Sequence, residues 1–276
     1  MPAPLGVIAG NGRLPFEVLR AARDRGLEVA VAAIEANTDP AIESLANGPF
    51  TWVAAGELER LIAFLKGSGA RQVVFAGGIT KPELLRDPAA LRPDARALGL
   101  LARLVDRGDD AILRAVAGEL ESEGLEVVAS TVHLGERLTP AGPLTACPVD
   151  PRMTSDLELG LRVAHALGVH DVGQSVVVKE GTVLAVEAVE GTDASIRRGA
   201  GIGGAGAVVV KASKPGQDLR FDVPAIGPAT IEVAVEAELA AIGLEAGRTI
   251  VLEREQTLPA AERAGIAVIG LRIQEP

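Results

Sequence analysis

Charged and polar side chains gather at two places in the second half of the chain. Two β-branched strands, at 175–178 and 182–187, are joined by Glu180-Gly181, a turn sequence typical of hairpins. Polar groups crowd the end of this hairpin: Glu187, Glu190, Thr192, Asp193, Arg197 and Arg198. A second charged stretch follows the next expected strand: Lys211, Lys214, Gln217, Asp218, Arg220 and Asp222. Hard carboxylate oxygens beside cations suit a divalent metal and a phosphate, whereas solvated turns and helix caps are the alternative.

Composition excludes several other kinds of site. The chain of 276 residues has one cysteine and three scattered histidines, so a disulfide framework, a Cys-rich zinc site and acyl transfer by a Ser-His pair are not expected. Its formal net charge of −10 gives a field that repels nucleic acid. No run approaches about 18 uninterrupted apolar residues, so we expect a cytoplasmic protein. A peripheral contact with a membrane stays open.

Two glycine turns follow expected strands in the first half. Residues 5–9 lead into Gly10-Asn11-Gly12, and residues 72–76 lead into Gly77-Gly78 with Lys81 close behind. Backbone N–H groups at such a strand–turn–helix junction can hold an anion. The first turn lacks the third glycine of GxGxxG, so an ordinary turn and a solvated lysine stay open. From their position we expect these residues to contact a nucleotide or phosphate: Gly10, Asn11, Gly12, Gly77, Gly78 and Lys81.

The hydrophobic pattern predicts an α/β fold in two domains. Alternating strand and helix patterns predict an N-terminal Rossmann-like, doubly wound sheet over residues 1–136, as a substrate- and nucleotide-binding domain. Frequent prolines predict a linker at 137–153. Residues 154–276 are expected to form a C-terminal catalytic α/β domain with a mixed sheet. There we expect helices at 154–167, 228–242 and 259–264, and strands at 207–211, 248–252 and 265–271. The glycine-rich stretch 199–206 is expected to be a flexible loop, with a phosphate-cradling loop as the alternative.

Several strings of residues, spread in order over nearly the whole chain, resemble one family. They are Ile8-Ala9-Gly10-x-Gly12-x-Leu14-Pro15, Phe75-Ala76-Gly77, Gly108-Asp109-Asp110, Gly173-Gln174, Val183-Leu184-Ala185-Val186-Glu187-Ala188-x-Glu190-Gly191-Thr192-Asp193-Ala194, and Lys214-Pro215-x-Gln217-Asp218-x-Arg220-x-Asp222-x-Pro224-x-Ile226-Gly227. With these strings the chain is similar to the LpxI-type UDP-2,3-diacylglucosamine pyrophosphatases of lipid A biosynthesis. It departs from the family's expected pattern in the glycine-rich stretch 199–206.

The resemblance implies a metal-dependent hydrolase that uses Mg²⁺ or Mn²⁺. It would cut UDP-2,3-diacylglucosamine into UMP and 2,3-diacylglucosamine 1-phosphate (lipid X), and it would be a homodimer of two-domain chains that hold the substrate between their domains. Asp222 matches the family's catalytic aspartate, and Asp193 and Glu190 are our choices for further catalytic groups. All three are expected to be metal ligands. The remaining residues expected to bind substrate are Asp109, Asp110, Gln174, Thr192, Lys211, Lys214 and Gln217.

Other interpretations are open on the residues themselves. Asp109 and Asp110 precede an expected helix at 111–123, where N-capping explains most of their pattern. A non-catalytic nucleotide- or lipid-binding protein, with the carboxylates in salt bridges, is the main alternative. A nicotinamide oxidoreductase is the weakest alternative, although Glu35 lies where a ribose-binding acid could be placed.

For the lipid substrate, a groove of Leu, Val and Ile would hold the acyl chains, with a peripheral contact at the inner membrane left open.

Overall fold

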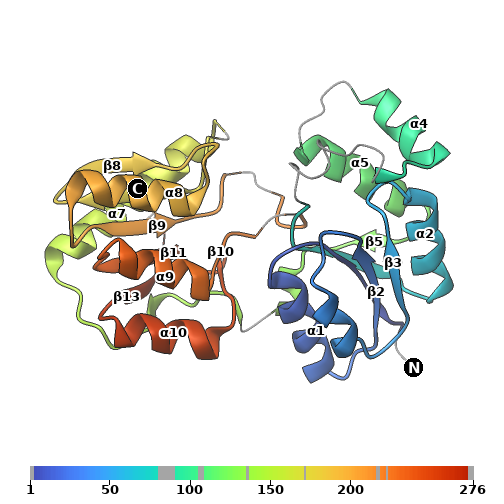
Figure 1. Cartoon of the computed structure of the whole chain (residues 1–276), viewed down its shortest axis with the longest axis horizontal. Helices are drawn as coiled ribbons and strands as arrows, with labels where there is room; N and C mark the ends of the chain where they lie inside the picture. Colours follow the sequence, from blue (N-terminus) through green and yellow to red (C-terminus); the bar gives the residue numbers. More distant parts are fainter. Residues whose placement is uncertain are drawn as a thin grey trace. The chain divides into compact units, whose positions relative to one another are not determined.

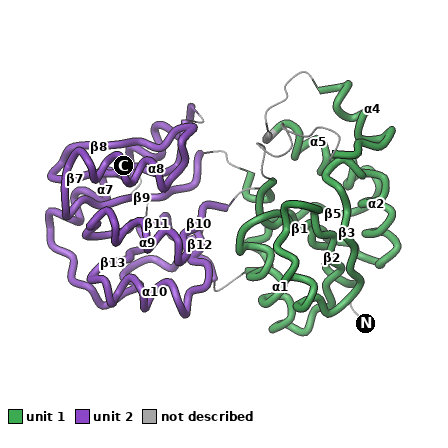
Figure 2. The backbone as a smooth tube through the Cα atoms, in the orientation of Figure 1, with its two compact units in different colours: residues 1–135, 218–222 green, residues 136–217, 223–276 purple. Residues whose placement is uncertain are grey.

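The chain forms two compact α/β units. A computed structural model describes residues 3–79, 91–104, 109–134, 137–170, 172–215, 218–221 and 223–272, with the backbone alone at 109 and 110. The first unit contains residues 1–135 and 218–222, and the second contains residues 136–217 and 223–276 (Figure 2). Among the described residues, no helix combines the length and the apolar composition needed to cross a membrane.

The first unit is built on a parallel sheet. Its strands are β1 (Leu5–Ala9), β2 (Val29–Ile34), β3 (Phe50–Val53), β4 (Gln72–Ala76) and β5 (Glu126–Val127), in the order β3-β2-β1-β4-β5. Strands β2, β3 and β5 of this sheet are labelled in Figure 1. Every neighbouring pair is parallel. All residues of β1 and β2 are buried, which is the pattern of central strands covered on both faces. The α/β class expected from the sequence is confirmed.

Helices cover this sheet. They are α1 (Leu14–Asp24), the short 3₁₀ helix η1 (Pro40–Leu45), α2 (Leu58–Gly67), α4 (Ala95–Arg103), α5 (Asp109–Ser122) and α6 (Thr131–Leu134). Apolar residues of α2, α4 and α5 share one core cluster with the strands, whereas α1 packs against α6 and η1. The spacing of Leu58, Leu61, Ile62 and Leu65 on α2 shows how a 3.6-residue period places one apolar face on a sheet.

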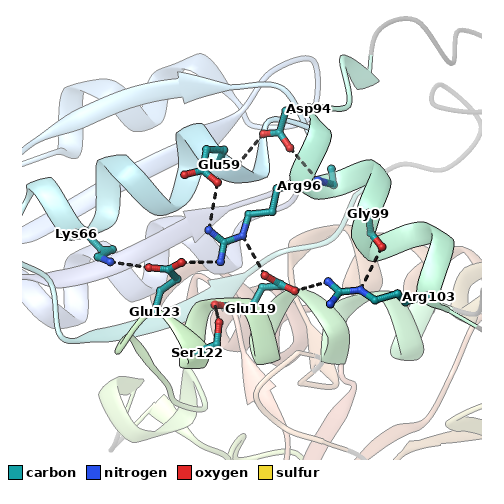
Figure 3. A network of polar contacts seen from close by, with 10 residues as sticks. Glu59, Lys66, Asp94, Arg96, Gly99, Arg103, Glu119, Ser122 and Glu123 are labelled. Carbon is teal, nitrogen blue, oxygen red and sulfur yellow. Dashed lines mark hydrogen bonds and ion pairs between the residues drawn. The ribbon is translucent and has the colours of Figure 1, made fainter.

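A network of ion pairs centred on Arg96 joins α2, α4 and α5 (Figure 3). The Arg96 guanidinium bonds to the carboxylates of Glu59, Glu119 and Glu123 at 3.1, 2.9 and 2.7 Å. Lys66 Nζ adds a 2.6 Å bond to Glu123. Lys66 first, and Arg96 second, lower the pKa of Glu123 to about 2. These charges satisfy one another, so their role in this unit is to hold the helices together.

The second unit is built on a mixed sheet. Its strands are β6 (Gly142–Pro143), β7 (Ser175–Lys179), β8 (Thr182–Val186), β9 (Val208–Lys211), β11 (Ala241–Glu245) and β13 (Ala267–Leu271), in the order β6-β13-β11-β9-β7-β8. Strands β9, β11 and β13 are parallel, while β6, β7 and β8 are antiparallel to their neighbours. The expected mixed sheet and the hairpin around Glu180-Gly181 are thus confirmed. A small parallel pair, β10 (Ala225–Ile226) with β12 (Ile250–Val251), lies beside it.

Helices α7 (Pro151–Gly168), α8 (Thr192–Gly203), α9 (Pro228–Glu236) and α10 (Arg254–Arg263) complete this unit. Val177 and Val209 belong to one core cluster with α8, α9 and α10, while Val176 and Val178 belong to another with α7. Because successive residues of a strand point to opposite faces, α7 covers one face of the sheet and the other three helices cover the opposite face.

The glycine-rich stretch 199–206 was expected to be a loop, but its residues 199–203 form the last part of α8. A Cβ atom at Gly199 would lie 2.7 Å from Val177 Cβ, and one at Gly203 would lie 2.3 Å from Leu184 Cδ1. These glycines let the helix approach the hairpin closely, so packing outweighs their low helix propensity.

Two further element boundaries differ from expectation. Helix α9 ends at Glu236 and strand β11 follows, where one helix was expected as far as residue 242. The short apolar run of β11 fits either period, and its pairing with β9 and β13 decides for a strand. Helix α10 begins at Arg254 and holds Pro259 inside it, earlier than the expected start at 259.

One buried carboxylate supports the hairpin turn. Asp156 on α7 is 6% exposed, and its oxygens accept hydrogen bonds from the backbone N–H groups of Glu180 and Gly181 at 2.8 and 2.7 Å. We expect Asp156→Ala to lower the free energy of unfolding by about 1–3 kcal/mol, because it leaves two turn donors without an acceptor. Urea denaturation measures the loss, and Glu158→Ala, an exposed change on the same helix, is the control. Equal stability of the two variants would contradict this role.

Candidate active site

The two glycine turns of the first unit meet at one edge of its sheet. Strands β1 and β4 are adjacent and end together, with Ala9 opposite Ala76. The N–H of Gly10 donates to the carbonyl of Ala76 at 2.8 Å, and that of Asn11 donates to the carbonyl of Gly78 at 2.7 Å. In return Gly78 N–H donates to Asn11 Oδ1 at 3.1 Å. The carboxyl edge of the sheet therefore carries both turns, as their positions after parallel strands predict.

Close approach of the two turns accounts for Gly10 and Gly77. A Cβ atom at Gly10 would lie 2.2 Å from the carbonyl oxygen of Gly78. Gly77 has φ of +82°, and a Cβ there would lie 2.1 Å from the carbonyl oxygen of Asn11. Gly12, with φ of +81°, meets no such neighbour and leads to the start of α1. The backbone and side chain of Asn11 join the two turns, which gives these turns a structural role. Contact of the turn residues with substrate stays a prediction.

Three other predicted residues of the first unit have limited structural description. Lys81 lies outside the described residues, as do the side chains of Asp109 and Asp110. Helix α5 begins at Asp109, two residues before the expected start at 111, so both residues lie inside its first turn and neither occupies the expected N-cap position. Glu35 forms an ion pair with Arg92, which lowers the pKa of this carboxyl. This contact gives Glu35 a role that requires no nicotinamide ribose.

The second charged stretch of the sequence does not stay within one unit. Asp218 to Phe221 belong to the first unit, although β9 before them and β10 after them belong to the second. Phe221 is part of the core cluster of the first unit. Gln217 and Asp222 lie outside the described residues. Asp222 directly follows Phe221 in the chain, so the residue predicted to be catalytic comes immediately after a segment that belongs to the first unit.

A polar cluster centred on Thr192 lies within the second unit. Lys211 Nζ donates to Thr192 Oγ1 at 3.0 Å, and this hydroxyl donates to Glu187 Oε1 at 3.1 Å. Ser175 Oγ lies 3.3 Å from the same hydroxyl. The four side chains come from the start of β7, the end of β8, the start of α8 and the end of β9, and Ser175 is the register partner of Lys211. The structure thus brings together the predicted Thr192 and Lys211 with Glu187 and Ser175.

Two unused acceptors belong to Glu187 of the Thr192 cluster and to Gln174, which precedes Ser175 in the chain. Glu187 Oε2 and Gln174 Oε1 are buried and have no hydrogen-bond partner among the residues that the structure describes. Gly173 lets its backbone lie close to the backbone of Glu187, because a Cβ at Gly173 would lie 2.1 Å from the carbonyl oxygen of Glu187. Buried acceptors without partners carry a desolvation cost. A ligand with donor groups, or a cation, would remove that cost, which makes this cluster the best candidate for a binding site in the second unit.

The carboxylates chosen as metal ligands do not gather in the described part of the chain. Glu190 forms an ion pair with Arg198, which lowers the Glu190 pKa. Asp193 is exposed in the first turn of α8. Within the described ranges, no group of three or more His, Cys, Asp or Glu side chains could hold a metal ion. These residues by themselves therefore do not supply a ligand set, and we derive no step through a bound metal.

Glu245 is a buried carboxylate that the sequence pattern did not indicate. It is 2% exposed, and its Oε2 accepts a 2.7 Å hydrogen bond from the backbone N–H of Ser213. His165 Nε2 lies 3.3 Å from the same oxygen, and Arg248 Nε lies 3.5 Å from Oε1. Glu245 thereby holds the loop that carries Lys214. Strand β11 ends at Glu245 beside β9. The contact between Glu245 and Ser213 therefore depends on the pairing of two distant strands, and no local sequence pattern indicates it.

Two domain models of one protein family match the two halves of the chain. A model of the LpxI N-terminal domain matches residues 4–136, and a model of the LpxI C-terminal domain matches residues 140–269. The UDP-2,3-diacylglucosamine pyrophosphatase LpxI of Caulobacter vibrioides is 40% identical over 282 residues, with 98% of each chain covered.

Solved structures of biotin carboxylases are more distant. The biotin carboxylase subunit of a pyruvate carboxylase is 14% identical, with a TM-score of 0.25 over 67% of this chain and 35% of that one. The biotin carboxylase domain of Hydrogenobacter thermophilus 2-oxoglutarate carboxylase is 13% identical, with a TM-score of 0.24 over 64% and 35%. Scores this low carry no argument about fold or function. The two domain matches and the full-length relative show that this chain belongs to the LpxI family.

Proposed function

We propose that this chain hydrolyses the pyrophosphate bond of UDP-2,3-diacylglucosamine, releasing UMP and 2,3-diacylglucosamine 1-phosphate (lipid X) in lipid A biosynthesis. The observation that carries the proposal is its relation to the Caulobacter enzyme, whose name states that activity and which matches 98% of this chain at 40% identity. Because the match runs through both units, the proposal draws on the whole chain and on more than a shared binding domain.

The Thr192 cluster supports a phosphate contact in the second unit. Lys211 supplies a cation, and Thr192 is the first residue of α8, whose amino end favours negative charge. Gln174 and Glu187 add polar atoms that are buried and unpartnered within the described residues. In our proposal Lys211 and Thr192 bind phosphoryl oxygens, while Glu187 and Gln174 orient the substrate through its donor groups.

The direct test uses purified protein and UDP-2,3-diacylglucosamine with Mn²⁺ or Mg²⁺. We expect release of UMP and lipid X, and the reaction in ¹⁸O-labelled water locates the phosphorus that is attacked. Substrate binding without any UMP would replace the hydrolase proposal by the alternative of a non-catalytic nucleotide- or lipid-binding protein. No binding and no UMP would remove both.

Metal dependence is a separate part of the proposal. A bound Mg²⁺ or Mn²⁺ would neutralise charge on the pyrophosphate, and Asp193, Asp222 and Glu190 are the candidate ligands. Recruiting Glu190 would require its ion pair with Arg198 to open. Chelator-treated protein is expected to be inactive and to regain activity on titration with Mn²⁺ or Mg²⁺. Full activity after chelation would contradict the metal requirement and leave the hydrolysis itself intact.

Replacing Lys211 should impair catalysis much more than replacing a second lysine of the same unit. We expect Lys211→Gln to lower kcat/KM by about 10²-fold, the size of effect seen when one charge-stabilising donor is removed. Lys179→Gln is the matched control, because Lys179 Nζ bonds to the carbonyls of Gly203 and Ala205 at the end of α8. Steady-state UMP release measures both variants. Equal kcat/KM values would exclude Lys211 from substrate contact.

Architecture and assembly complete the proposal. The all-parallel order β3-β2-β1-β4-β5 supports a Rossmann-like, doubly wound description of the first unit as the nucleotide-binding domain. The second unit would be the catalytic α/β domain. The stretch 137–153, expected as a linker, contains β6 and the first residues of α7, which belong to this unit. A homodimer and a peripheral contact with the inner membrane are proposed from family resemblance. Sedimentation of the purified protein, alone and with phospholipid vesicles, tests both.

A further inference from the structure

The segment Asp218–Phe221 is an apolar and ionic attachment to the first unit. Phe221 is 9% exposed and belongs to the core cluster of that unit. Its ring meets the ring of Phe75 edge to face, with centroids 5.5 Å apart. Phe75 lies on β4, two residues before Gly77. A chain segment that leaves the second unit is therefore attached next to the strand end where the glycine turns meet.

A clamp of charged groups holds the same segment. Arg220 Nε and Nη2 bond to both oxygens of the Asp218 carboxylate at 2.7 to 3.0 Å, and Nη1 bonds to Glu121 at 3.0 Å. The Arg220 guanidinium also lies 5.1 Å from the centroid of the Phe221 ring. Arg220 first, and Arg114 to a smaller extent, lower the pKa of Asp218. Arg114 and Glu121 are seven residues apart on α5, so one helix face presents complementary charges to this segment.

We propose that Phe221 and Arg220 are positioning residues, which fix the backbone that leads directly into Asp222. The inference rests on the proposed function, because it takes Asp222 as the catalytic carboxylate. A reacting group must be held to within a fraction of an ångström, and such precision comes from packing and hydrogen bonds behind it. The buried Phe221 ring and the Arg220 bond to Glu121 on α5 provide that support, while the bidentate bonds between Arg220 and Asp218 fix the shape of the segment itself.

Kinetics distinguishes positioning from general stabilisation. We expect Phe221→Ala to lower kcat about 10- to 100-fold, the size of effect caused by a misplacement of about 1 Å. Substrate affinity, measured for both Phe221 forms in an Asp222→Asn background, should change less than about threefold, since no substrate contact is removed. Phe221→Leu keeps an apolar anchor and should restore most of the turnover. Phe64→Ala is the matched control: this ring packs against the same core from α2, and its loss should leave kcat within about twofold.

Hydrogen exchange tests the anchor apart from activity. In the full chain, Phe221→Ala should raise exchange of the peptide covering residues 218–224 at least about tenfold, while Phe64→Ala should not. If Phe221→Ala does not fold, Arg220→Lys serves instead, since it keeps the charge and loses the bidentate clamp. Unchanged exchange or an unchanged kcat in a folded variant would overturn the inference. A wild-type protein that releases no UMP, yet shows the exchange difference, would refute the proposed function and leave the anchor standing.

Discussion

Replacing Asp222 with asparagine is expected to lower kcat by about 10²- to 10⁴-fold while substrate binding stays within a fewfold of the wild type. The substitution keeps the shape of the side chain and removes its charge, so it abolishes proton acceptance from water and weakens any metal coordination. Release of UMP measures kcat, and titration with the uncleaved substrate measures binding. Asp222 is chosen because it is the aspartate of the D-x-P-x-I-G string.

Asp150→Asn is a suitable control for this loss of charge. Asp150 caps α7 by accepting a hydrogen bond from Met153 N–H at 2.8 Å, and asparagine is an equally good cap. The control should retain full turnover. If Asp222→Asn were as active as Asp150→Asn, Asp222 would have no part in the chemistry, and the role of the anchor at Phe221 would fall with it.

Replacing Gly77 with alanine should destabilise the first unit by about 2–5 kcal/mol. The estimate combines about 1–2 kcal/mol for a Cβ in the left-handed region with about 1–3 kcal/mol for overpacking. The φ of Gly77 is +82°, and its new Cβ would lie 2.1 Å from the backbone oxygen of Asn11, which cannot move without opening the junction of the turns. Urea denaturation followed by circular dichroism measures the change.

Gly118→Ala, in the same unit, is expected to raise stability where Gly77→Ala lowers it. Gly118 lies inside α5, is exposed, and has no atom within 4 Å of an added Cβ. Alanine there should stabilise the helix by up to about 1 kcal/mol. A Gly77→Ala variant as stable as Gly118→Ala would show that the two turns are not held as closely as described, and would weaken the case for a rigid edge at this end of the sheet.

Several charged side chains that could have marked a functional site form ion pairs with one another. Of the hairpin-end groups, Glu190 and Arg198 pair with each other, and Arg197 pairs with Glu236 at 3.1 Å. Glu35, which a ribose-binding interpretation would use, pairs with Arg92. What singles out the Thr192 cluster is therefore burial together with unpartnered acceptors among the described residues. Exposed ion pairs contribute little to stability, so their presence alone points to no function.

Features with a local cause were predicted from the sequence. The hairpin around Glu180-Gly181 was expected because turn chemistry and β-branched residues act over a few positions. The strands leading to Gly10 and Gly77 were expected because a short apolar run before glycine marks a buried strand end. The prediction of a loop at 199–206 was wrong because the glycines there are explained by a long-range contact, which local patterns do not reveal. Glycine lowers helix propensity locally, whereas contact with Val177 and Leu184 selects glycine from a distance.

The sequence by itself determined the α/β class, the glycine turns, the hairpin and membership of the LpxI family, because periodicity, turn residues and motif strings are local properties. Tertiary structure alone decided which charges meet. It placed Ser175 and Lys211 in register, brought Glu245 to Ser213, and placed Phe221 in the core of the first unit. These contacts depend on strand pairing and burial between residues far apart in the chain, and no local pattern encodes them.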